Sequence, residues 1–99
     1  MNILIDARWI NIKNIDGIST FTINIIKELI KKYRDKFFIL VENKEKSDFL
    51  KNNFDINSNF IYSNYSINSI KNIFKIKDII NKFFIDLYFS PNIVFFYPL

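Results

Sequence analysis

The stretch that decides the fold is NILID (residues 2–6), in which Ile and Leu follow one another without a polar interruption until Asp6. Such a run is typical of a strand that is buried on both faces, as strands are in a parallel sheet. Apolar, β-prone runs recur at residues 37–41, 59–63 and 85–89. The sequence therefore predicts about four strands, the first of them at the start of the chain.

Between the first two strands, apolar side chains recur every three or four residues, as in an amphipathic helix. They are Ile18, Phe21, Ile25, Ile26, Leu29, Ile30 and Tyr33. We expect Asp16 to cap this helix and Glu28 to pair with Lys32 one turn further on. The pattern thus predicts a helix that begins at Ile18 and turns these apolar residues to one side.

Two more helices complete the alternation. Ser47 or Asp48 is placed to cap a short helix that reaches Asn52. A longer helix is expected over residues 66–83, with its apolar positions at Ile67, Ile70, Ile73, Phe74, Ile76, Ile80 and Phe84. The lysines along one side of it, Lys71, Lys75 and Lys82, are expected to face water, with a weak membrane-surface contact as the alternative.

Strands that alternate with helices predict an α/β fold: a Rossmann-like parallel sheet in the order 3-2-1-4 with flanking helices. We expect a single domain over residues 1–99. In this order, the strand at residues 2–6 lies between those at 37–41 and 85–89. Ligands of such sheets bind at the carboxyl ends of the strands, so the residues after Asp6 and after residue 89 are the candidate site.

Composition excludes several kinds of site. The 99 residues include no Cys and no His, which excludes disulfides, thiolate zinc sites and Ser-His-Asp triads. The single Gly excludes the Walker A loop and the dinucleotide fingerprint. Neither a cofactor nor a metal is implied.

The formal charge of +4 does not by itself indicate a nucleic-acid partner, and we expect none. Lys, Asn, Ile and Phe, which A- and T-rich codons encode, dominate the chain, and no basic run is longer than Lys31-Lys32. The apolar runs are far shorter than the ~20 residues that cross a bilayer. The first residues also lack the layout of a secretory signal, so we expect a cytoplasmic protein.

Asp6 and Arg8 allow two interpretations. In a ligand site, the carboxylate would accept hydrogen bonds from sugar hydroxyls and the guanidinium would bind phosphate or carboxylate. In a structural role, Asp6 would cap local amides or pair with Arg8. Gly17 would let a phosphate or sugar approach the positive end of a helix, or serve as a turn residue with positive φ. Ser19 offers a hydroxyl, but no base is present to activate it.

Four short motifs occur in a recognisable order: ILIDAR (residues 3–8), GISTF (17–21), DLYFSPN (86–92) and PL (98–99). Together they resemble the amino-terminal domain of group 1 (GT4-type) glycosyltransferases of the GT-B fold. The chain departs from that pattern at Ser19, where a second glycine is usual, at Thr20 and Phe21, where Arg and Tyr are common, and at Phe89, where His is frequent.

The resemblance implies the acceptor-side part of a nucleotide-sugar-dependent, retaining glycosyltransferase of envelope or polysaccharide biosynthesis, peripheral at the inner membrane face. Asp6, Arg8, Gly17 and Ser19 would line the cleft, with Ser90 and Asn92 opposite. Nucleotide sugar and glycan acceptor would bind only in the full-length enzyme, because the donor-binding domain of the family is not encoded in these residues. We therefore expect a truncated chain that is inactive alone.

The expected partners are a carboxy-terminal half or a second copy of the chain. The strand at residues 85–89 would form a sheet edge, and residues 93–97 are apolar, so we expect the isolated chain to associate. The alternative interpretation is a non-catalytic α/β interaction module that binds a partner through this exposed edge.

Overall fold

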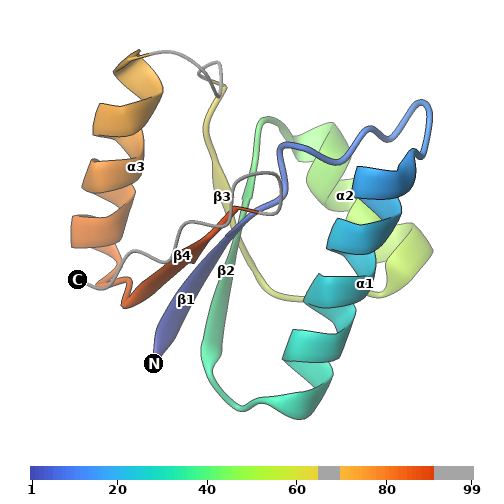
Figure 1. The fold of residues 1–99 in the computed structure, drawn as a ribbon, viewed down its shortest axis with the longest axis horizontal. Coiled ribbons are helices and arrows are strands. Elements are labelled where there is room, and N and C mark those ends of the chain that lie inside the picture. Colours follow the sequence, from blue (N-terminus) through green and yellow to red (C-terminus); the bar gives the residue numbers. More distant parts are fainter. Residues whose placement is uncertain (65–69, 91–99) are drawn as a thin grey trace.

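A parallel sheet forms the centre of the protein in a computed structural model that describes residues 1–64 and 70–90. Its strands are β1 (Asn2–Asp6), β2 (Lys36–Val41), β3 (Asn59–Tyr62) and β4 (Leu87–Phe89). All pairs are parallel, and the order is β3-β2-β1-β4 (Figure 1). The predicted fold class, the strand order and the position of β1 between β2 and β4 are confirmed.

The side chains of β1 alternate between two hydrophobic cores. Ile3 and Ile5 belong to the core beneath the first two helices, whereas Leu4 belongs to the core on the opposite face. A strand covered on both faces needs apolar residues at every position, which is why residues 3–5 show no polar alternation. The uninterrupted run at the start of the sequence thus reflects a central strand.

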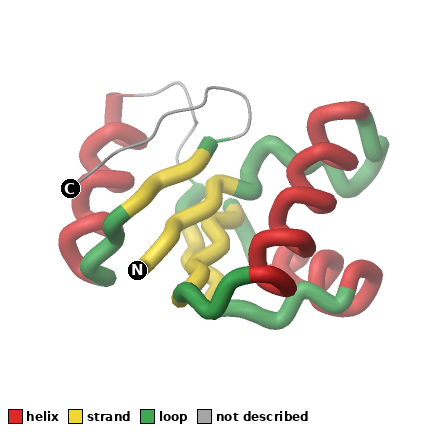
Figure 2. Tube along the Cα trace, turned by 60° about the horizontal axis from the view of Figure 1, so that its bottom comes forward, coloured by secondary structure: helices red, strands yellow, loops and turns green. Residues whose placement is uncertain are grey.

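Three helices cover the two faces of this sheet. On one face lie α1 (Gly17–Lys32) and α2 (Lys44–Phe54), and on the other lies α3 (Ile70–Lys82) (Figures 1 and 2). Within the described residues, no helix is both long enough and apolar enough to cross a bilayer. The predicted start of α3 at Ser66 falls in the segment 65–69, outside the described residues.

The capping prediction holds for α1 and is wrong for α2. The Asp16 carboxylate accepts a hydrogen bond of 2.8 Å from the Ser19 amide, as an N-cap does. For α2 the cap is Asn43, whose side chain accepts from the Lys46 amide at 2.9 Å. Because an Asn cap precedes Ser47, the helix begins earlier than predicted, and Ser47 lies inside it with its hydroxyl bonded to the Lys44 carbonyl. The expected pair of Glu28 and Lys32 is present at 3.4 Å.

The predicted apolar face of α3 is wrong in its first turns and at Phe84, which lies after the helix and is exposed. Ile76 and Ile80 are buried as expected, but Ile70, Ile73 and Phe74 are exposed, at 73%, 64% and 63% of their surface. The buried stripe instead includes Asn72, which accepts a hydrogen bond from Arg8. Asn72 lies one turn before Ile76, so its polar contact extends the buried stripe into the first turn of α3. Lys71 and Lys82 are exposed as predicted, and Lys75 is half-buried.

The first turn of α1 departs from prediction in a similar way. Ile18 and Phe21 are exposed, whereas Ser19 and Thr22 are buried. Both buried hydroxyls are bonded, Thr22 to the Ile18 carbonyl and Ser19 to the amide of Asn11. The buried side of this first turn is therefore polar, and Ser19 ties it to the loop between β1 and α1. Further along, Ile26 is buried, and Ile25, Leu29 and Ile30 are half-buried.

Candidate functional site

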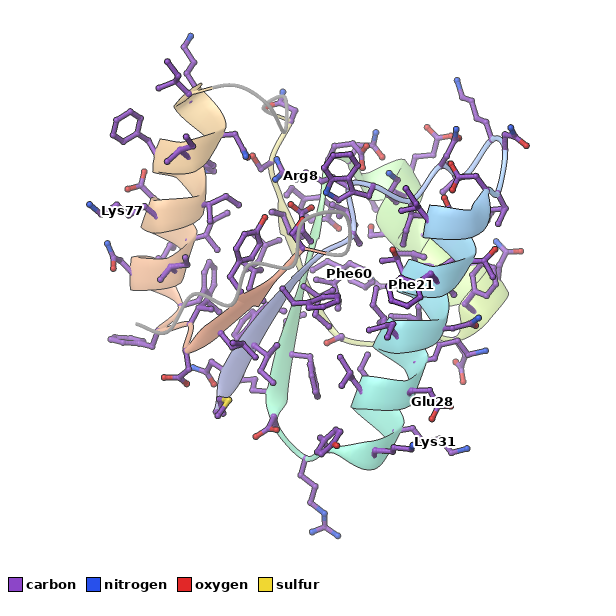
Figure 3. All side chains as sticks on the ribbon, viewed as in Figure 1. Arg8, Phe21, Glu28, Lys31, Phe60 and Lys77 are labelled. Atoms are coloured by element: carbon purple, nitrogen blue, oxygen red, sulfur yellow. The ribbon has the colours of Figure 1, made fainter. Side chains whose placement is uncertain are left out.

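A buried polar network lies where β1 ends. One Asp6 oxygen, Oδ1, accepts from the Arg8 amide at 3.1 Å and from Arg8 Nε at 2.9 Å. The other, Oδ2, accepts from Arg8 Nη2 and from the Tyr88 hydroxyl, both at 2.7 Å. Arg8 Nη1 donates to Asn72 Oδ1 on α3 at 2.6 Å, and Figure 3 shows Arg8 at the end of the sheet, on the side of α3. The network therefore joins β1, β4 and α3.

The charges of this network are removed from solvent. The side chains of Arg8 and Asp6 are 2% and 0% exposed. Burial opposes the charged guanidinium, but the hydrogen bonds and the charge of Asp6 outweigh burial and raise the pKa of Arg8 above its ordinary value. Burial and then the Asp6 charge raise the pKa of the Tyr88 hydroxyl above its ordinary value. Tyr88 is therefore a neutral donor at physiological pH.

Of the two interpretations of Asp6 and Arg8, the geometry corresponds to the structural pair. Among the described residues, the hydrogen bonds to the Asp6 carboxylate come from Arg8 and Tyr88, and four donors fill its two oxygens. Binding a ligand directly would require breaking these bonds in a buried environment. Tyr88 and Asn72 were not anticipated from the sequence, because partners 82 and 64 residues away leave no local spacing to detect.

Gly17 and Ser19 occupy different environments at the start of α1. Gly17 is the first residue of the helix, has no positive φ, and would have no atom within 4 Å of an added Cβ. The alternative of a positive-φ turn residue is therefore wrong, and an open space lies beside the helix start. Ser19 is buried, and its hydroxyl accepts from the Asn11 amide at 2.7 Å. Ser19 thus orders the loop that follows β1.

Ser90 lies beside the end of β1, as the sheet order requires. Its hydroxyl accepts a hydrogen bond of 3.2 Å from the indole nitrogen of Trp9, the sole tryptophan. Ser90 is buried and Trp9 is half-buried. Asn92, the remaining predicted site residue, lies outside the described residues. The tips of β1 and β4 are thus adjacent, and Trp9 connects them.

An open pocket of about 410 Å³ lies next to this connection, between the loops that follow β1 and β2. It is lined by residues 8–13 together with Glu42, Asn43, Glu45 and Lys46. Lys46 is buried; its ammonium lies 2.8 and 3.0 Å from the two carboxylate oxygens of Glu42 and donates to the Arg8 carbonyl at 3.1 Å. That lysine holds the two loops at a fixed separation.

The pocket brings an indole ring together with amide, carboxylate and ammonium groups, a combination suited to a polar ligand with one apolar face. The sequence predicted a site at this edge of the sheet, as found, but formed it from Asp6, Arg8 and the start of the first helix. Trp9 was missed, although its position directly after Arg8 carried the signal. Chemically, the pocket offers binding groups, while the described residues show no nucleophile held by a base.

Comparison with known proteins finds no match to this chain among family models, curated proteins or solved structures.

Proposed function

We propose that this chain is the acceptor-side part of a nucleotide-sugar-dependent glycosyltransferase, which transfers sugar to a glycan or lipid-linked acceptor and has no activity by itself. The motifs ILIDAR, GISTF and DLYFSPN support the proposal by their resemblance to GT4-type enzymes. The structural observation that carries it is the Trp9–Ser90 contact, because the tips of β1 and β4 meet there, at the edge where Rossmann-like sheets bind ligands.

The pocket between the loops after β1 and β2 is the proposed acceptor surface. A sugar presents an apolar face, which an indole ring can cover, and hydroxyls, which Asn11, Asn43 and Glu45 can bind. Asp6 and Arg8 take the role of positioning residues: Asp6 accepts from the Arg8 amide and Lys46 donates to the Arg8 carbonyl, which holds the backbone just before Trp9. Catalysis would then need donor and acceptor held together by a second domain.

A transfer assay tests the proposal. The chain is co-expressed with a candidate carboxy-terminal half, and transfer of radiolabelled sugar from nucleotide sugars to membrane-extracted acceptor is measured for each half and for the pair. We expect transfer from the pair and none from either half. Absence of transfer and of nucleotide-sugar binding, in both the pair and a fused chain, would contradict the proposal.

A second candidate, a non-catalytic interaction module, is favoured by one observation: α3 exposes Ile70, Ile73 and Phe74 although it is otherwise packed on the sheet. Exposed apolar side chains gathered on one helix face mark contact surfaces. Sedimentation velocity, which measures association, and the transfer assay together separate the candidates. In a module, the Ile73→Ser and Phe74→Ser double variant loses association with the partner, whereas in the glycosyltransferase part it leaves sugar transfer by the co-expressed pair intact.

A further inference from the structure

A groove of about 650 Å³ runs along β3 to the last turn of α3, and its described lining shares no residue with that of the Trp9 pocket. Its floor is aromatic and aliphatic, formed in part by Phe38, Phe60, Ile61 and Phe83. Phe38 is buried, and its ring packs against that of Phe83 with the centroids 5.3 Å apart. The groove is therefore built on ordered core residues.

Three lysines line this groove, and none of its described lining residues is Asp or Glu. Each ammonium lies over a phenylalanine ring, 5.2 to 5.5 Å from its centroid, in the pairs Lys36 with Phe38, Lys51 with Phe60 and Lys82 with Phe83. None of the three takes part in an ion pair among residues 1–64 and 70–90. Each ring holds a lysine ammonium in place, and the ammonium can still bind a carboxylate.

The strand beside these lysines has one unoccupied edge in the described sheet. Among the described strands, β3 pairs only with β2, and the Ser63 amide donates to the Val41 carbonyl on that side. Because backbone groups alternate in direction along a strand, the amides of Phe60 and Tyr62 point away from β2. They form a short row of donors and acceptors that an additional strand could pair with.

We propose that this groove binds an extended acidic segment of a partner protein, which adds to the sheet along β3. The partner's backbone would pair with the outward groups of Phe60 and Tyr62, and its Asp or Glu side chains would contact Lys36, Lys51 and Lys82. Addition of a strand to a sheet edge supplies affinity through the main chain, and the charge pattern supplies selectivity.

A single-stranded nucleic acid is disfavoured by the same contacts. Such ligands stack their bases on open aromatic faces, whereas the rings of Phe38, Phe60 and Phe83 each carry an ammonium over one face. A nucleic acid also has no strand-like backbone to pair with the β3 edge. An acidic peptide would use both the lysine ammonium groups and the backbone edge of β3.

Fluorescence anisotropy of the 99-residue chain with a labelled peptide of alternating Glu and Val tests the proposal. We expect binding that weakens as salt is raised, and a loss of about tenfold in affinity in the Lys51→Glu and Lys82→Glu double variant. The matched control is the Lys44→Glu and Lys77→Glu double variant, which changes charge equally on the same helices; Lys44 and Lys77 line no part of the groove, and Lys77 projects from the outer side of α3 (Figure 3).

A second pair of variants tests strand addition. Tyr62→Ala removes the side chain and keeps the amide, whereas Tyr62→Pro also removes the outward N–H, at an edge position where proline is tolerated. We expect the proline variant to bind the peptide several-fold more weakly than the alanine variant. Absent binding, equal losses in the groove and control variants, or tighter binding of a single-stranded oligonucleotide than of the peptide would overturn the proposal. Failure of the sugar-transfer assay would leave these results unaffected.

Discussion

The hydroxyl of Tyr88 donates a hydrogen bond of 2.7 Å to Asp6, which ties the last described strand to the first across 82 residues. Asp6 also accepts from Nε and Nη2 of Arg8, and Nη1 of Arg8 donates to Asn72 on α3. A single carboxylate therefore connects the elements that surround the carboxyl edge of β1. Asp6 does not itself line the pocket beside Trp9; it acts on the pocket through Arg8, which does.

Substitution Asp6→Asn should destabilise the protein by about 3 kcal/mol, because it leaves the Arg8 cation buried without its counter-charge. Urea unfolding followed by circular dichroism measures the loss. The matched control is Asp78→Asn, on the exposed side of α3, which should change stability by less than about 0.5 kcal/mol.

The double variant Asp6→Asn with Arg8→Met gives the companion measurement. Removing the cation as well should recover part of the lost stability, since an apolar side chain of similar length needs no counter-charge in a buried site. A double variant less stable than Asp6→Asn alone would contradict a role for Asp6 in neutralising Arg8.

The raised pKa of Tyr88 predicts a loss of stability at high pH. The native state disfavours the phenolate, so its contribution is complete below the ordinary pKa of 10.0 and declines as pH rises above that value. Denaturant unfolding at a series of pH values should show this decline in the native sequence and a flatter profile in Tyr88→Phe. Equal slopes in both proteins would show that another group is responsible.

Acid should weaken the start of α1. Hydrogen bonds from Ser19 lower the pKa of Asp16 below its ordinary value of 3.8, so the charged cap stabilises the fold above that value and the contribution is lost as pH falls through the lowered pKa. In Asp16→Asn the cap remains without a titrating group. Amide hydrogen exchange at Ser19 and Thr20, whose amides donate to Asp16, should accelerate in acid, relative to the intrinsic rate, only where Asp16 is retained.

Much of the fold was predictable because local pattern and topology agree. Uninterrupted apolar runs identified β1 and β2 as central strands, the strand–helix alternation predicted a parallel sheet, and the common order of such sheets, β3-β2-β1-β4, is the one found. The buried faces of the helices were less accessible, because each includes polar residues beside its apolar ones. Asn72 faces the sheet to meet Arg8, and Ser19 faces it to hold Asn11, so the neighbouring apolar residues Ile73 and Ile18 turn outward.

The candidate site, too, was only partly predictable from the sequence. Its location followed from the sheet order, but whether Asp6 binds a ligand or Arg8 depends on distances that a sequence does not contain. The Trp9–Ser90 contact joins residues 81 apart, and the Lys46 contact with the Arg8 carbonyl joins residues 38 apart. Long-range side-chain geometry, rather than local spacing, defines the pocket.

Titration of the ¹⁵N-labelled chain with methyl glycosides of glucose, galactose and mannose, followed by NMR, tests the central claim that the pocket beside Trp9 binds sugar. Shifts are predicted for the Trp9 indole and for the amides of residues 9–13 and 42–46, with no change in the Trp9→Ala variant. Shifts absent from these loops, or strongest along β3 and in the last turn of α3, would contradict it.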